Sequence, residues 1–171
     1  PFLGTVLVRE IMTHRVITLP LDRTLEQASE RLVEEGISGA PVVDGRGRLV
    51  GILSESDLLQ HFRTVAQEIL GKRYQTDRVH SLAVLAFLGK RRHGAVDRVY
   101  ARLRSSRVED AMTKKVFSVR PSDVVEAAAS VMVVHDVNRV PVVEDRKVVG
   151  IVSRADLARV LAVGRGREPR L

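Results

Sequence analysis

The pattern of apolar and polar positions along the chain occurs twice. An apolar run containing Pro-Val-Val is followed by a charged turn, a β-branched run containing Gly, and Ser-x-x-Asp-Leu, in residues 40–58 and again in 140–157. The sequences before these stretches align at an offset of 100, which becomes 99 after the turn. A duplicated structural unit tolerates a deletion in a turn, because loops accept length changes and strands do not. The chain therefore contains two repeats, 8–62 and 108–163.

Each repeat is predicted to open with a turn and an extended run. The extended runs are residues 16–19 and 116–119, which are rich in β-branched or apolar residues. Pro20 follows the first run directly and Pro121 follows the second after Arg120, and proline lacks the N–H that a strand interior needs. We expect both strands to stop at these prolines.

The remainder of each repeat predicts a helix, two strands and a second helix. Apolar residues at helical spacing indicate the first helix, with Asp123 and Glu126 as a capping box in the second copy and Gly36 as the stop in the first. Two β-branched runs joined by a polar turn predict the strand pair. The last helix is expected to start near Ser54 or Ser153. The unit is therefore β-α-β-β-α.

One such unit is too small to cover its own sheet, so the two copies are expected to pack face to face around a shared core. The predicted fold class is α+β (mixed α/β): tandem β-α-β-β-α repeats in a pseudo-twofold pair, with a helical insertion between them. This geometry would create two related clefts.

The insertion, residues 63–107, has no counterpart in either repeat. It holds eleven Lys and Arg against three acidic residues, whereas the net charge of the whole chain is +7. Residues 95–103 have one apolar helical face, and residues 82–88 are apolar nearly all round, so this segment needs cover from the chain or from a second subunit. The tail, 164–171, is expected to be disordered.

Composition removes several classes of function. The chain has no cysteine, which excludes disulfides, thiolate zinc sites and cysteine nucleophiles. Its five histidines lack metal-ligand spacing, and neither a Ser-His-Asp arrangement nor a glycine-rich phosphate loop can be assembled. We therefore expect a protein that is not an enzyme, with no metal and no catalytic cofactor. No apolar run is long enough to span a membrane, so we expect no membrane partner and a cytoplasmic location.

Ser54-x-x-Asp57 and Ser153-x-x-Asp156 each lie where a strand becomes a helix. One interpretation is helix capping, because Ser at the N-cap and an acid three residues later satisfy unpaired amides. The other is a nucleotide site, in which helix amides and the Ser hydroxyl bind phosphate and the carboxylate accepts ribose hydroxyls. The two interpretations are compatible.

The combination of these motifs resembles the CBS domain pair, or Bateman module. The resemblance rests on Gly51 and Gly150 before the apolar pair, Pro41 and Pro141 on the adjacent strand, and both copies in register. It implies a non-enzymatic regulatory module, commonly a homodimer. Such a module binds an adenine nucleotide (AMP, ADP, ATP or a related adenosyl ligand) in clefts between the repeats.

The resemblance also implies site residues. Asp57 and Asp156 would hold the ribose, and the other members of each cleft come from the same repeat and from the opening run of the opposite repeat. The first cleft would comprise Asp57, Ser54, Ser38, Gly39, Ala40 and Ile52, with Met112, Thr113 and Phe117. The second would comprise Asp156, Ser153, Asn138, Arg139, Val140 and Ile151, with Met12, Thr13 and Ile17.

The two clefts are expected to differ. Arg139 offers a guanidinium for phosphate where its counterpart, Gly39, offers none, which favours a phosphorylated nucleotide at the Asp156 cleft. A solvated surface arginine is the other interpretation. Two further functions stay open: a nucleic-acid-associated protein that uses the basic insertion, and a structural dimerisation domain with empty clefts.

Overall fold

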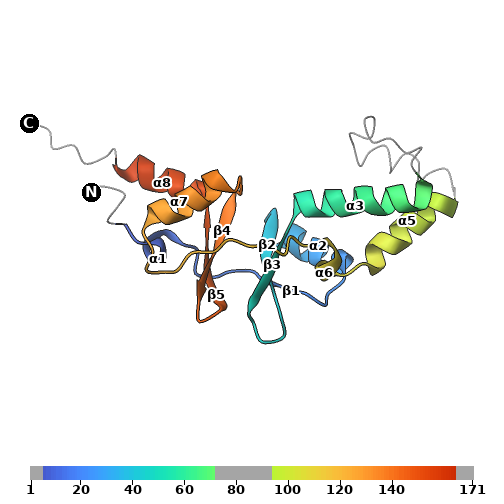
Figure 1. Cartoon of the computed structure of the whole chain (residues 1–171), viewed down its shortest axis with the longest axis horizontal. Coiled ribbons are helices and arrows are strands. Elements are labelled where there is room, and N and C mark those ends of the chain that lie inside the picture. The colour runs from blue at the N-terminus through green and yellow to red at the C-terminus, as the bar shows by residue number, and fades with distance from the viewer. Residues whose placement is uncertain (1–5, 72–93, 165–171) are drawn as a thin grey trace, which may run out of the picture. The chain divides into compact units, whose positions relative to one another are not determined.

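The protein is described by a computed structural model that covers residues 6–71 and 94–164. Its elements are shown in Figure 1. In chain order they are α1 (Val8–Ile11), β1 (Leu19–Pro20), α2 (Leu25–Glu34), β2 (Gly39–Val43), β3 (Leu49–Ser54), α3 (Glu55–Leu70), α5 (Gly94–Ser105), α6 (Val108–Ala111), α7 (Val125–Val134), β4 (Arg139–Glu144), β5 (Lys147–Ser153) and α8 (Arg154–Gly164).

The fold class is α+β, as predicted, and the first repeat has the predicted β-α-β-β-α order after the short helix α1. The first repeat forms a three-stranded sheet in the order β1-β2-β3. In the second repeat β4 and β5 pair antiparallel, with Pro141 opposite Ile151 and a bulge at Val142/Val143. An isolated parallel bridge from Val119 to Val142 replaces the first strand there.

The expected extent of the opening strands is wrong. β1 contains only Leu19 and Pro20, so residues 16–18 are not part of it, although the strand does end at Pro20 as expected. Proline is tolerated because β1 lies at the edge of its sheet, where an N–H is not needed for pairing. In the second repeat only Val119 of the extended run pairs, through the bridge described above.

The predicted capping box of Asp123 and Glu126 is also wrong. α7 begins one residue later than that motif requires, with Val124 at the N-cap and no side-chain cap. The Asp123 carboxylate instead accepts a hydrogen bond from the Arg120 N–H at 2.7 Å. In the first repeat the residue equivalent to Val124 is Thr24, whose hydroxyl caps α2 in a capping box with Gln27.

The first helix of the first repeat ends as the sequence predicts. α2 stops at Glu34, and Gly36 then adopts a left-handed conformation with φ 63°. Asp136 takes the same role after α7, with φ 49°. Glycine and Asp are among the residues that enter this region most easily.

The two strand-to-strand turns differ in the way that the single deletion predicts. Asp145 and Arg146 both have positive φ, 49° and 67°, as the two central residues of a type I′ hairpin turn do. The longer turn of the first repeat is built around Asp44, which accepts hydrogen bonds from the Arg46 and Arg48 N–H groups, both at 2.9 Å. The length change is therefore confined to the turn.

The chain divides into two compact units, and each unit combines parts of both repeats. One contains the described residues of Pro1–Thr18, Val43–Val50 and Lys115–Leu171. The other contains those of Leu19–Val42 and Gly51–Lys114. The opening segment of each repeat, with its short helix, thus belongs to the unit that holds the last helix of the opposite repeat.

In the first of these units, α7 packs against β4 and α8 packs against β5 (Figure 1). Its core residues have exposed fractions of 5% or less, and they include Val8 of α1. They are Val8, Val119, Ala128, Met132, Val140, Val142 and Val152. Burial of Val8 among residues of the second repeat helps to hold the opening segment there, together with hydrogen bonds from the Val8 and Arg9 N–H groups to the Asp123 and Pro121 carbonyls.

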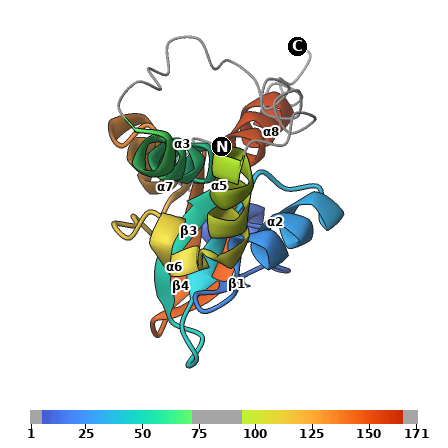
Figure 2. The same cartoon turned by 90° about the vertical axis from the view of Figure 1, so that its right-hand side faces the viewer.

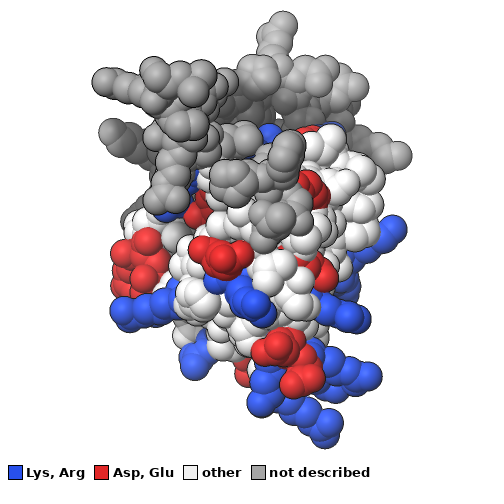
Figure 3. Space-filling model, turned by 90° about the vertical axis from the view of Figure 1, so that its left-hand side faces the viewer, with Lys and Arg blue, Asp and Glu red and all other residues white. Residues whose placement is uncertain are grey.

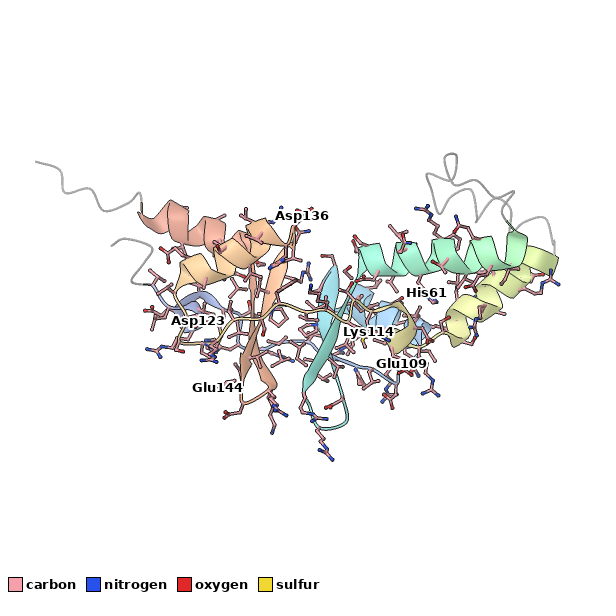
Figure 4. The ribbon with its side chains drawn as sticks, in the orientation of Figure 1. His61, Glu109, Lys114, Asp123, Asp136 and Glu144 are labelled. Atoms are coloured by element: carbon pink, nitrogen blue, oxygen red, sulfur yellow. The ribbon has the colours of Figure 1, made fainter. Side chains whose placement is uncertain are left out.

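In the other unit, α3 and α5 lie side by side (Figures 1 and 2). Val65, Ala66 and Val99 are buried between them, as the apolar face of residues 95–103 predicted. Figure 4 shows His61 between these helices, where its Nε2 lies 2.9 Å from the buried Ser106 hydroxyl. The apolar segment 82–88 lies outside the described residues. Of the tail 164–171, Gly164 is the last residue of α8 and residues 165–171 lie outside the described residues.

Candidate ligand sites at the Ser-x-x-Asp helix starts

The helix start at Ser54 places a carboxylate between two hydroxyl groups. Asp57 Oδ2 accepts hydrogen bonds from the Ser54 N–H at 2.8 Å and from the Ser54 hydroxyl at 2.6 Å. Its other oxygen, Oδ1, accepts the Thr113 hydroxyl at 2.7 Å. Thr113 also pairs with Ile52 through two backbone hydrogen bonds, of 2.9 and 3.0 Å. The opening segment of the second repeat is therefore fixed to this helix start.

The helix start at Ser153 repeats this geometry with one change. Asp156 Oδ2 accepts from the Ser153 N–H at 2.8 Å and from its hydroxyl at 2.7 Å, and Thr13 pairs with Ile151. The Asp156 Oδ1 atom, however, accepts from the guanidinium of Arg159 at 2.5 Å. Asp156 is nearly buried, with 7% of its side chain exposed, whereas 73% of the Arg159 side chain is exposed.

The glycine of each motif makes room for a methionine. A Cβ added at Gly51 would lie 2.5 Å from Met112 Sδ and 3.1 Å from the Thr113 carbonyl oxygen. At Gly150 the corresponding atom would clash with Met12 Sδ. The Met-Thr pair of each opening segment and the glycine of the opposite repeat are thus parts of one packing arrangement.

The residues before the strand prolines are linked to the helix starts by backbone hydrogen bonds. The Glu55 N–H donates to the Ser38 carbonyl, and the Arg154 N–H donates to the Asn138 carbonyl, both at 3.0 Å. Since the N–H groups of both aspartates also bond to their serine hydroxyls, these helix starts offer fewer unpaired amides to a phosphate than the motif alone predicts.

The difference between Gly39 and Arg139 involves the backbone as well as charge. A Cβ at Gly39 would lie 2.8 Å from the Leu53 carbonyl oxygen, so β2 approaches β3 too closely there for a side chain. Ala40 and Val140 follow as buried residues of the two strands. Gly39 is therefore required by packing, whatever its effect on ligand charge.

The predicted members of the first site, apart from Phe117, fall within one unit. The second predicted set falls entirely within the other unit, and half-buried Ile17 belongs to it. Phe117 belongs to the unit that carries Asp156, and its ring stacks on His135 with centroids 3.4 Å apart. Its placement over Asp57 stays a prediction.

Charged side chains of both signs lie on the surface of the molecule. On the face shown in Figure 3, Lys and Arg lie interspersed with Asp and Glu. In the part of the chain that the structure describes, no group of three or more His, Asp or Glu side chains could hold a metal ion. Nor does any helix among the described residues have the length and apolar character to cross a membrane.

The sequence interpretation overlooked Arg159, although a signal was present. Residues i and i+3 of a helix share a face, which places Arg159 over Asp156. The equivalent residue in the first repeat is Gln60, so the alignment of the repeats already contained the difference.

The fold and the paired helix starts define a tandem-repeat α+β protein with one candidate site at the equivalent helix start of each repeat. The sequence profile of the CBS domain matches residues 8–64 and 108–163, and the chain belongs to this family. The resemblance seen in the sequence is thereby confirmed.

Individual relatives agree with this assignment. The chain is 30% identical to the uncharacterized protein MJ1426 of Methanocaldococcus jannaschii over 163 residues, which is 91% of each chain. It spans only 25% of the homoserine O-acetyltransferase of Methanohalobium evestigatum, to which it is 25% identical over 161 residues.

Two crystal structures are similar to most of the chain. The CBS domain of a CBS domain-containing membrane protein from Sphaerobacter thermophilus is 32% identical, with a TM-score of 0.65 over 92% of this chain and 88% of that one. CBSX2 from Arabidopsis thaliana, in complex with AMP, is 27% identical, with a TM-score of 0.64 over 95% of this chain and 99% of that one.

Proposed function

We propose that this protein is a non-enzymatic regulatory module that binds an adenine nucleotide at its Ser-x-x-Asp helix starts. The observation that carries the proposal is the nearly buried Asp156 carboxylate, oriented by the Ser153 N–H and hydroxyl. A carboxylate held in this way is a rigid acceptor for ribose hydroxyls. The binding of AMP by the related CBSX2 supports adenine as the base.

The neighbouring residues fit the rest of such a ligand. Ile151 is half-buried on the strand that ends at Ser153 and offers an apolar surface for a base. Met12 and Thr13 flank the same strand from the opposite repeat. In the other site Ile52, Met112 and Thr113 have these roles around Asp57. Arg139 supplies a positive charge that favours phosphate at the Asp156 site.

Regulation would follow from the origin of the flanking segments. Each Met-Thr segment is continuous with one repeat and pairs with a strand of the other. A ligand that competes for the Asp57 or Asp156 carboxylate would change how tightly that segment is held. Its effect is limited to the difference in its affinity for the two arrangements.

We further propose that the module is a homodimer. Val133 and Val134 of α7 have exposed fractions of 80% and 71%, and Val33 at the equivalent position of α2 also has 80%. Exposed apolar residues at equivalent positions of both repeats suit an interface between copies. Sedimentation equilibrium tests this: a dimer that Val133→Glu dissociates supports the proposal, and a monomer at all concentrations refutes it.

The ligand assignment is tested by calorimetric titration of AMP, ADP and ATP. Replacing Asp156 by Asn should weaken binding by about tenfold or more, because a charged acceptor for ribose hydroxyls is lost. Asp123→Asn is the matched control, since Asp123 also accepts a backbone N–H near a helix start of the same unit. Absence of binding by all three nucleotides, or equal binding by wild type and Asp156→Asn, would refute the assignment at that site.

A further inference from the structure

Asp57 and Asp156 differ in the group that donates a hydrogen bond to Oδ1, the carboxylate oxygen that does not bond to the serine. At Asp57 this oxygen accepts the neutral Thr113 hydroxyl. At Asp156 it accepts the Arg159 guanidinium, which lies one helical turn further along α8. The counterpart of Arg159 in α3 is Gln60, which has no positive charge.

We propose that Arg159 is a specificity-determining residue, which makes the Asp156 site prefer phosphorylated adenosine to adenosine itself. This inference rests on the proposed function, since it assumes that Asp156 holds the ribose. It adds a specificity-determining residue that neither the shared motif nor the resemblance assigns.

The first step of the argument is competition for one oxygen. Asp156 Oδ2 already accepts two hydrogen bonds from Ser153, so Oδ1 is the atom with room for a ribose hydroxyl. Arg159 now donates to that atom. A bound ribose therefore shares Oδ1 with the guanidinium or displaces it.

The second step is the freedom of the arginine. Its side chain is 73% exposed, and within the described residues its guanidinium group donates to Asp156 Oδ1 and, at 3.4 Å, to the Ala155 carbonyl. A displaced guanidinium stays tethered one turn from the ribose and can pair with a phosphate of the same ligand. Arginine pairs well with phosphate because its planar fork can donate two parallel hydrogen bonds.

The charge of the ligand decides whether Arg159 raises or lowers its affinity for the Asp156 site. An uncharged nucleoside would displace Arg159 from Asp156 and would leave the guanidinium without an anionic partner in the ligand. A nucleotide replaces the lost ion pair by one between guanidinium and phosphate. Arg159 should therefore disfavour adenosine and favour AMP, whereas a residue that only orients Asp156 would affect both ligands equally.

The test compares AMP with adenosine in calorimetric titrations of the full chain, in an Asp57→Asn background that leaves one intact site. Arg159→Gln introduces the residue found at the equivalent position of the first repeat. We expect this change to reduce the AMP-to-adenosine affinity ratio by about tenfold, mostly through weaker AMP binding. Adenosine should bind with equal or higher affinity.

Arg154→Gln is the matched control. Arg154 belongs to the same helix and carries the same charge, but its guanidinium pairs with Asp136 at 3.3 Å. This substitution should leave the AMP-to-adenosine ratio unchanged. A ratio that falls equally in both variants would show a general charge effect and would overturn the specific role of Arg159.

Two further outcomes separate the inference from the function it rests on. If AMP and adenosine both bind and Arg159→Gln weakens them by the same factor, Arg159 only holds Asp156 in place and the inference is wrong, while the nucleotide site stands. If neither ligand binds the wild-type chain, the proposed function fails and the inference falls with it.

Discussion

The Thr113 hydroxyl donates a hydrogen bond of 2.7 Å to Asp57 Oδ1, across 56 positions of sequence. The bond connects the opening segment of the second repeat to the last helix of the first. It also occupies the oxygen that a ribose would use at this site. Segment attachment and ligand binding therefore depend on the same carboxylate at Asp57.

Replacing Thr113 by Val should destabilise the protein by about 1 kcal/mol, because a carboxylate oxygen loses a hydroxyl donor while the side-chain volume is kept. The free energy of unfolding in urea measures the effect. Thr13→Val is the matched control, since no hydrogen bond of the Thr13 hydroxyl occurs among residues 6–71 and 94–164. Equal losses in the two variants would contradict a specific role for the Thr113 bond.

Gly51→Ala should destabilise the protein by about 1–3 kcal/mol, because the added Cβ meets Met112 and the backbone of Thr113. Gly45→Ala provides the control, since a Cβ there would meet nothing within 4 Å. Thermal unfolding of both variants measures the difference. Adding Met112→Ala to Gly51→Ala should recover part of the loss, and strictly additive effects would show that the two residues are not in contact.

Asp44 gives the turn of the first hairpin a dependence on pH. Hydrogen bonds from the Arg48 N–H and side chain lower the pKa of Asp44 from 3.8 to about 2. A carboxyl group whose folded pKa is lowered contributes stability above its ordinary pKa, and that contribution is lost as pH falls through the folded value. The turn should therefore weaken between about pH 4 and pH 2.

Urea unfolding between pH 2 and pH 5 measures this, with Asp44→Asn as the comparison. We expect the stability difference between wild type and variant to shrink as pH falls through this window. Asp136→Asn is a suitable control, because the Asp136 side chain, which pairs with Arg154, is 98% exposed. A wild-type advantage that stays constant down to pH 2 would contradict the role assigned to Asp44.

The sequence predicted those features that depend on local pattern. The strand pairs, the helix starts at Ser54 and Ser153 and the stop at Gly36 all follow from residue types whose backbone preferences are strong. The Asp123 cap failed because an acidic residue near a helix can bond to a turn amide as easily as to a helix amide, and here it bonds to Arg120.

The sequence predicted the site residues that the two repeats share, but not the residues that make the two sites different. The pairing of Thr113 with Ile52 joins segments far apart in the chain, so the hydrogen bond to Asp57 could not be derived from spacing. Arg159 was within reach of sequence reasoning, since i and i+3 share a helical face. The motif that the repeats share does not include this position, where the first repeat has Gln60 and the second has Arg159.

The central claim is that the Asp156 carboxylate holds the ribose of an adenine nucleotide, and a double-substitution cycle tests it most directly. The affinities of AMP and 2′,3′-dideoxy-AMP are measured by calorimetry for the wild type and for Asp156→Asn. We predict that removing the hydroxyls weakens binding to the wild type by about tenfold or more, and weakens binding to the variant much less, because the two changes remove one interaction. Equal affinity of the wild type for both ligands, or losses that simply add, would contradict the claim.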